Sequence, residues 1–192
     1  MKLHYKGKYD RNPDSIPCKP HKPNCVKFKE PEDSKKLGRI VNLLAIPILL
    51  IFYIPVLMVD SENMNAPSII GLLLCIAGLF PHEILHALCF KEDVYLYTNL
   101  RHGMLFVAGP EDMSKARFIF MSLLPNIVLG FIPYIIFLMN TDWAVLGIFG
   151  ALNIASGAGD YLNVYNAITQ MPKGARTYLH KFNSYWYIPE EN

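Results

Sequence analysis

Apolar residues are concentrated in four long runs, at residues 40–59, 67–90, 115–139 and 143–170. A helix needs about 20 apolar residues to cross the hydrocarbon core of a bilayer, and each run reaches that length. Residues 1–39 and 171–192 are polar by comparison. The pattern predicts an all-α integral membrane protein with an N-terminal segment (1–39), a membrane domain of four transmembrane helices (40–170) and a C-terminal tail (171–192).

The connection between the second and third runs contains one short β signal. β-branched and aromatic residues at 94–98 and 104–107 flank an Asn-Leu-Arg-His-Gly turn. This arrangement is typical of a β-hairpin. We therefore expect a small hairpin between the second and third helices of an otherwise helical fold.

Composition and charge support a membrane protein and indicate its orientation. Of the 192 residues, 52% are hydrophobic and 18% charged, whereas a soluble domain has about a quarter charged residues. All eighteen Lys and Arg residues lie in 1–40, 91–117 and 171–192, and none lies in the connections 60–66 and 140–142. Positive residues favour the cytoplasmic side. We expect a multi-pass protein of the cell membrane with both termini and the hairpin in the cytoplasm, surrounded by lipid and without a nucleic-acid partner.

The second run contains the segment HEILH at residues 82–86. Residues four apart on a helix lie about 6 Å apart along its axis and on nearly the same face, so His82 and His86 could bind one zinc ion. Glu83 would lie beside the metal as a general base. Ionisable residues inside a span are costly and indicate function. The alternative is that this helix ends near residue 80 and the histidines lie at the headgroups.

A third zinc ligand must come from elsewhere, and Asp160 is the leading candidate because it is the acidic residue of the fourth run. Counted from the outer ends of their runs, His82 and Asp160 lie at depths that differ by about 3 Å. Small residues at 147, 151, 155 and 159 would let this helix approach another closely. The alternative is a carboxylate at a helix end in contact with water.

Other candidate residues are weaker. His102, Glu111 and Asp112 lie in the loop region, and the group Cys18, His21 and Cys25 lacks an evident fourth ligand for a second zinc site. Asn126 lies between Pro125 and Pro133, where the third helix is expected to be kinked or broken. It would contact a substrate strand or make an interhelical hydrogen bond.

Five segments carry a resemblance to a known family: YKGKYD, HEILHAL, SLLPN, SGAGDYLN and MPKGARTY. The chain resembles the DUF3267 family of zincin-type bacterial membrane peptidases, which are similar to site-2 intramembrane metalloproteases. The resemblance implies zinc held by His82, His86 and Asp160, with Glu83 as the base. In the site-2 pattern the third ligand lies in an Asn-Pro…Leu-Asp-Gly context, whereas Tyr161 and Leu162 follow Asp160 here.

The resulting functional prediction is a zinc-dependent intramembrane metalloprotease that hydrolyses peptide bonds of transmembrane or membrane-edge proteins. The main alternative is a non-catalytic membrane scaffold or metal-binding protein that keeps the zincin fold. A second alternative is a small transporter whose His and Asp side chains bind a translocated ion.

Overall fold

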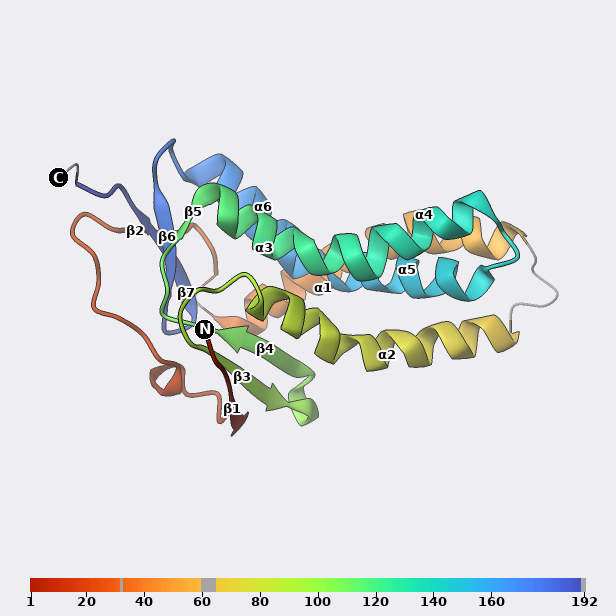
Figure 1. Ribbon diagram of the computed structural model, residues 1–192, viewed down its shortest axis with the longest axis horizontal. Coiled ribbons are helices and arrows are strands. Elements are labelled where there is room, and N and C mark those ends of the chain that lie inside the picture. The colour runs from red at the N-terminus through yellow and green to blue at the C-terminus, as the bar shows by residue number, and fades with distance from the viewer. Residues whose placement is uncertain (32, 60–64, 191–192) are drawn as a thin grey trace. The chain divides into compact units, whose positions relative to one another are not determined.

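The computed structural model describes residues 1–31, 33–59 and 65–190 (Figure 1). Most of the connection expected at 60–66 therefore lies outside the described residues. In chain order the elements are β1 (Leu3–Lys8), η1 (Pro13–Ser15), β2 (Val26–Lys27), α1 (Ser34–Val59), α2 (Asn65–Ala87), β3 (Val94–Asn99), η2 (Leu100–His102), β4 (Met104–Ala108), β5 (Met113–Ser114), α3 (Lys115–Pro125), η3 (Asn126–Phe131), α4 (Ile132–Met139), α5 (Ala144–Ser156), α6 (Ala158–Gln170), β6 (Arg176–His180) and β7 (Asn183–Tyr187).

The chain forms two compact units. Unit 1 contains Met1–Glu32, Glu83–Ser122 and Asn163–Asn192, and unit 2 contains Asp33–His82 and Leu123–Leu162. Unit 1 carries all the strands, and unit 2 consists of helices. Helices α2, α3 and α6 each contribute residues to both units.

The prediction of an all-α fold with four transmembrane helices is wrong. Within the described residues, the structure combines its helices with two β-sheets, and three helices are long and apolar enough to cross a membrane: Lys35–Val59, Asn65–Ala87 and Lys115–Met139. The fourth run is divided into α5 and α6, which are bent by 48° at their junction. The junction is Ser156-Gly157, and Ser/Gly pairs are a common cause of sharp helix kinks. The Ser156 hydroxyl donates to the Asn153 carbonyl at 2.9 Å, next to the break.

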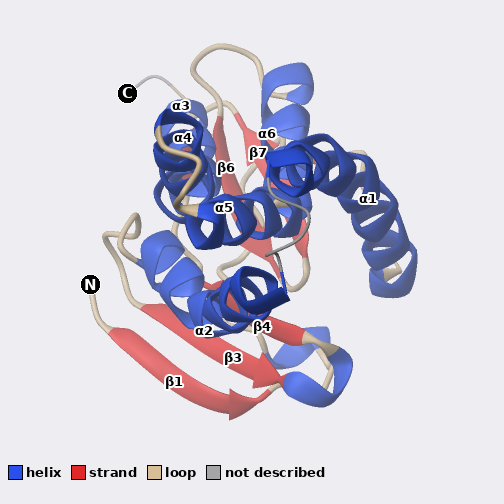
Figure 2. Ribbon diagram, turned by 90° about the vertical axis from the view of Figure 1, so that its right-hand side faces the viewer, coloured by secondary structure: helices blue, strands red, loops and turns tan. Residues whose placement is uncertain are grey.

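The strands of unit 1 come largely from the segments expected to be a polar N-terminal segment and a polar C-terminal tail. Strand β1 pairs in parallel with β3, which pairs in antiparallel with β4, and Figure 2 shows these three strands as one sheet. The predicted hairpin is therefore present, but inside a larger sheet. The second sheet has the order β2-β7-β6-β5. Leu3 pairs with Val94, and a partner so distant in the sequence cannot be identified from the residues around β1.

Unit 2 is held together by close helix packing. Its buried cluster joins Val56 of α1, Tyr134 and Phe137 of α4, and Ile148 and Ile154 of α5, together with Ala151. Gly147, one of the small residues expected to allow close approach, does so, because a Cβ there would lie 2.7 Å from the Phe137 ring. Gly150, which was not in that predicted series, has the same effect, because a Cβ there would lie 2.7 Å from the Tyr134 nitrogen. In the same way, a Cβ on Gly71 of α2 would lie 2.7 Å from Ile148 of α5. Small residues therefore bring α2 and α4 against α5.

The third apolar run is one continuous helix with a π-helical segment, rather than a broken helix. Residues Lys115–Met139 pass through α3, η3 and α4 without interruption. Segment η3 begins at Asn126, directly after Pro125. π-helical turns are rare and are frequently found at functional sites.

Candidate metal centre

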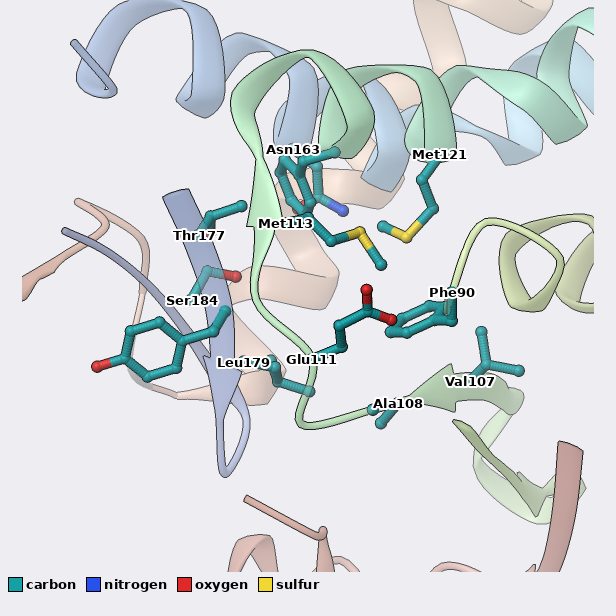
Figure 3. A pocket seen from close by; sticks show the side chains of 13 residues that line it. Phe90, Val107, Ala108, Glu111, Met113, Met121, Asn163, Thr177, Leu179 and Ser184 are labelled. Atoms are coloured by element: carbon teal, nitrogen blue, oxygen red, sulfur yellow. The ribbon is translucent and has the colours of Figure 1, made fainter. Parts of the chain in front are cut away.

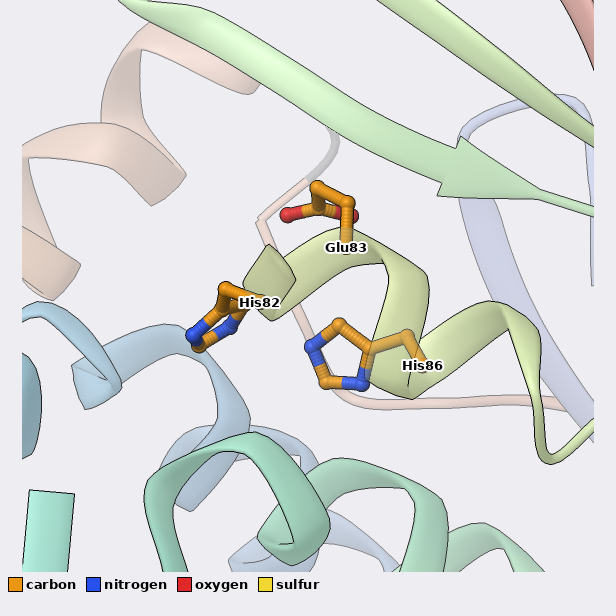
Figure 4. A group of neighbouring side chains, drawn as sticks. All are labelled: His82, Glu83 and His86. Carbon is orange, nitrogen blue, oxygen red and sulfur yellow. The ribbon is translucent and has the colours of Figure 1, made fainter. Parts of the chain in front are cut away.

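His82, Glu83 and His86 lie in the last two turns of α2, which continues to Ala87. This rules out the alternative that the helix ends near residue 80. The potential ligand atoms of the three side chains lie within 4.8 Å of one another, as the helical spacing requires (Figure 4). His86 is buried, and the other two side chains are partly buried. The two imidazoles can therefore act on one ion.

The His86 ring is held in one tautomer. Its Nδ1 lies 2.9 Å from the Met121 carbonyl oxygen. A carbonyl can only accept a hydrogen bond, so the proton is on Nδ1 and the lone pair is on Nε2. Metal-binding histidines almost always donate their second ring N–H in this way, often to a backbone carbonyl. His86 is thus prepared to offer Nε2 to a metal.

Proline at position 125 explains why the Met121 carbonyl is available. In an α-helix this carbonyl would accept the N–H of the residue four positions later. That residue is Pro125, which has no N–H. The proline therefore leaves an acceptor inside the helix, and His86 uses it.

The Glu83 carboxylate is held by a strand. Its Oε2 accepts the Val107 N–H of β4 at 2.9 Å, and a carboxylate oxygen of Glu83 lies within 4.8 Å of a ring nitrogen of each histidine (Figure 4). Strand β4 lies at an edge of its sheet, which has the order β1-β3-β4. Glu83 therefore lies beside the outer edge of a strand, where an extended peptide could bind.

Asp160 lies against His82 within unit 2. Asp160 Oδ2 and His82 Nε2 are 3.3 Å apart, with 13–14% of each side chain exposed. This separation is longer than an ordinary N–H···O hydrogen bond. It lies within the range of an ion pair, and it is also short enough for both side chains to bind one metal ion. The expected approach of these two helices is what the structure shows.

Asn126 makes the interhelical hydrogen bond that was one of its two expected roles. It is completely buried, and its amide nitrogen donates to Asp160 Oδ2 at 2.9 Å. The space for this side chain depends on Gly157, because a Cβ there would lie 1.6 Å from Asn126 Oδ1. The glycine at the α5–α6 break thus makes room for the residue that orients Asp160.

The loop candidates have structural partners in unit 1. Glu111 binds Arg117 and accepts the N–H groups of Lys91 and Glu92. Burial alone would raise the pKa of Glu111, but these hydrogen bonds outweigh it and hold the pKa below its ordinary value. Asp112 binds Arg176 and the Tyr187 hydroxyl, at 2.7 and 2.6 Å. Both carboxylates therefore stabilise the loop and the second sheet.

The N-terminal group of possible ligands is only loosely assembled. The rings of His21 and His180 stack with centroids 3.8 Å apart, and Cys25 Sγ lies 3.6 Å from His21 Nδ1. Among the described residues, the side chains that meet the spacing expected of a metal-binding group of three are those of α2. The side chain of His102 is outside the described part of the chain.

Three contributions to the centre were not identified from the sequence. They are the Met121 carbonyl, the Val107 N–H and the space at Gly157. Two are backbone groups, for which residue identity carries no direct signal. The Met121 carbonyl had an indirect one, since a proline inside a membrane helix frees the carbonyl four residues earlier.

Comparisons with known proteins place the chain in a family. No curated protein and no solved structure gave a significant match. The family model DUF3267, described as "Putative zincin peptidase", matches residues 75–176, more than half of the chain. The matched segment contains HEILH, Pro125, Asn126, Gly157 and Asp160. The protein therefore belongs to the DUF3267 family.

Proposed function

We propose that the protein is a zinc-dependent intramembrane peptidase in which His82, His86 and Asp160 hold the metal and Glu83 is the general base. Membership of a zincin-type family supports the class of activity. The observation that carries the proposal is the 3.3 Å separation of Asp160 Oδ2 from His82 Nε2. It brings a carboxylate to the HEILH helix and so supports Asp160 as the third of the three protein ligands that a catalytic zinc site needs.

The residues fit zinc by their chemistry and by their support. Two imidazoles and one carboxylate form a donor set typical of catalytic zinc sites, which leave a fourth position open. Two of the three ligands have outer partners, the Met121 carbonyl for His86 and the Asn126 amide for Asp160. Such partners fix the orientation of ligands and raise metal affinity.

Zinc, when bound, polarises a peptide carbonyl and makes water more acidic. Glu83 accepts a proton from the attacking water and later delivers it to the leaving amine. The Val107 N–H keeps the carboxylate of Glu83 oriented while it does so. Asn126 orients Asp160; its burial and this hydrogen bond favour that role over direct contact with substrate.

The substrates we propose are transmembrane or membrane-edge segments of proteins. In the part of the chain that the structure describes, three helices are long and apolar enough to cross a membrane. Helices α1 and α2 expose large apolar side chains, including Leu43, Ile51, Ile69 and Leu73. The distribution of Lys and Arg favours termini in the cytoplasm. A substrate helix must unwind before cleavage, because its carbonyls are engaged in its own hydrogen bonds. The outer edge of β4 offers such a segment new backbone partners beside Glu83.

Metal removal tests the proposal directly. We expect protein purified in nanodiscs to contain about one zinc ion per chain, as a single three-ligand site requires. Dialysis against o-phenanthroline should abolish hydrolysis of a quenched fluorescent peptide library, and added zinc should restore it. Hydrolysis that persists without metal, measured beside elemental analysis of the same sample, would contradict the proposal.

Pro125→Ala tests the support of His86. The new N–H at position 125 would compete for the Met121 carbonyl and loosen the Nδ1 hydrogen bond. We expect zinc affinity to fall by about 10–100-fold, the usual effect of losing an outer-shell partner. Competition with a fluorescent chelator measures the affinity. Pro133→Ala, in the same helix, is the matched control, and equal affinities of the two variants would refute this role for the proline.

A further inference from the structure

Unit 1 contains a cavity of about 150 Å³ next to the backbone groups that hold Glu83 and His86. Its walls come from β4, β5, β6 and β7, from α3 and α6, and from the loops that follow α2 and β4. Large apolar side chains make up much of the lining: Phe90, Val107, Met113, Phe118, Met121 and Leu179. Figure 3 shows the Met113 and Met121 thioethers directed into the same space as the Phe90 ring.

Two polar groups of the lining already have partners within the protein. The Glu111 carboxylate binds Arg117 and two backbone N–H groups. The Thr177 hydroxyl donates to the Tyr185 carbonyl at 2.9 Å. Because these two groups are satisfied and most of the other lining side chains are apolar, an apolar occupant suits the cavity.

The cavity has the size of one large side chain. Apolar cavities of about 150 Å³ in other proteins stay dry and bind benzene. A phenylalanine, leucine or methionine side chain therefore fits, whereas a glycine or alanine side chain would leave most of the space empty. Methionine walls adapt readily to occupants of different shape.

Two residues connect this cavity to the proposed centre. Val107 donates its N–H to Glu83 and Met121 accepts the Nδ1–H of His86, and both residues also line the cavity. All four residues belong to unit 1. A peptide whose backbone lies beside Val107 therefore places a neighbouring side chain at the cavity.

We propose that this cavity is the specificity subsite of the enzyme and that it receives a large apolar side chain next to the scissile bond. The proposal rests on the proposed peptidase function, because a scissile bond presupposes hydrolysis. Its occupant is the substrate itself.

Binding to the metal-free protein tests the subsite without requiring catalysis. The methyl groups of Met113 and Met121 are natural NMR reporters, and those of Met58 on α1 and Met139 on α4 are internal controls outside the lining. N-acetylphenylalanine amide and N-acetylleucine amide should shift the NMR signals of the Met113 and Met121 methyl groups, and the shifts should saturate with ligand concentration. The affinities of these two amides should be at least about tenfold above that of N-acetylglycine amide. Equal affinities for the three amides would overturn the proposal.

Two variants locate the binding. Asn163→Phe places a ring into the cavity from α6 and should abolish the shifts, whereas Ile168→Phe adds the same ring at an exposed position of α6 and should preserve them. Leu179→Ala enlarges the cavity and should improve binding of N-acetyltryptophan amide several-fold. Unchanged binding in both cavity variants would place the ligand elsewhere.

Selective binding without any metal-dependent hydrolysis would contradict the peptidase proposal but not the binding site. Hydrolysis without preference for large apolar residues would contradict the proposed subsite.

Discussion

Replacing Glu83 with Gln should abolish peptide hydrolysis while leaving bound zinc unchanged. Glutamine has nearly the same shape as glutamate, and its amide oxygen can still accept the Val107 N–H that holds Glu83 at 2.9 Å. It cannot accept a proton from water. General bases contribute about 10²–10⁴-fold to rate, and we expect a loss in that range. Initial rates on the peptide library and zinc content of the same preparation are the two measurements.

Glu92→Gln is the matched control, because Glu92 makes an exposed ion pair with Lys19 at 2.7 Å and has no role in the centre. It should hydrolyse peptides at the wild-type rate. If Glu83→Gln kept more than about a tenth of the wild-type rate, the base would be another group. If it lost zinc as well as activity, Glu83 would be a ligand. An unaltered cellular phenotype of Glu83→Gln would favour the non-catalytic scaffold.

The part of the candidate centre that lies on α2 could be predicted from the sequence, because helical periodicity sets the relative positions of its side chains. His82 and His86 are four residues apart, so any helix through residues 82–86 brings their rings together. The depth of Asp160 in the fourth run had a similar basis, since a constant rise per residue turns sequence distance into position along an axis. The fourth run is divided into α5 and α6, but His82 and Asp160 still lie 3.3 Å apart.

The sheets could not be predicted in the same way. Strand β1 is only six residues long, and its partner β3 begins 91 positions after the start of β1. Strand β6, RTYLH, lacks the alternation that marks a half-buried strand, and β1, LHYKGK, alternates only over its first four residues. The requirement for glycine at position 157 was hidden for another reason: the space beside it is filled by Asn126, a residue of a different helix. Local sequence patterns do not reveal such contacts between distant helices.

Replacing a residue should lower the zinc affinity more, the closer that residue lies to the metal. Asp160→Ala removes a proposed ligand whose Oδ2 lies 3.3 Å from His82 Nε2. Asn126→Ala removes only the amide that donates to that oxygen. We expect Asn126→Ala to weaken zinc binding by about 10–100-fold, as for other outer partners, and Asp160→Ala to weaken it further. Competition with chelators of graded affinity measures both losses on one scale.

Asp142→Ala is the control for this series, since Asp142 is an exposed acidic residue that precedes α5. It should bind zinc as tightly as the wild type. Thermal unfolding of the metal-free variants shows whether each one still folds, so that a lost ligand can be distinguished from a lost fold. Wild-type zinc affinity in folded Asp160→Ala would show that the third ligand is another residue. If the loss of zinc affinity instead increases from Asp142→Ala to Asn126→Ala to Asp160→Ala, then the Asp160 carboxylate is a ligand and the Asn126 amide supports it. A purely structural defect would not rank the variants by their distance from the ion.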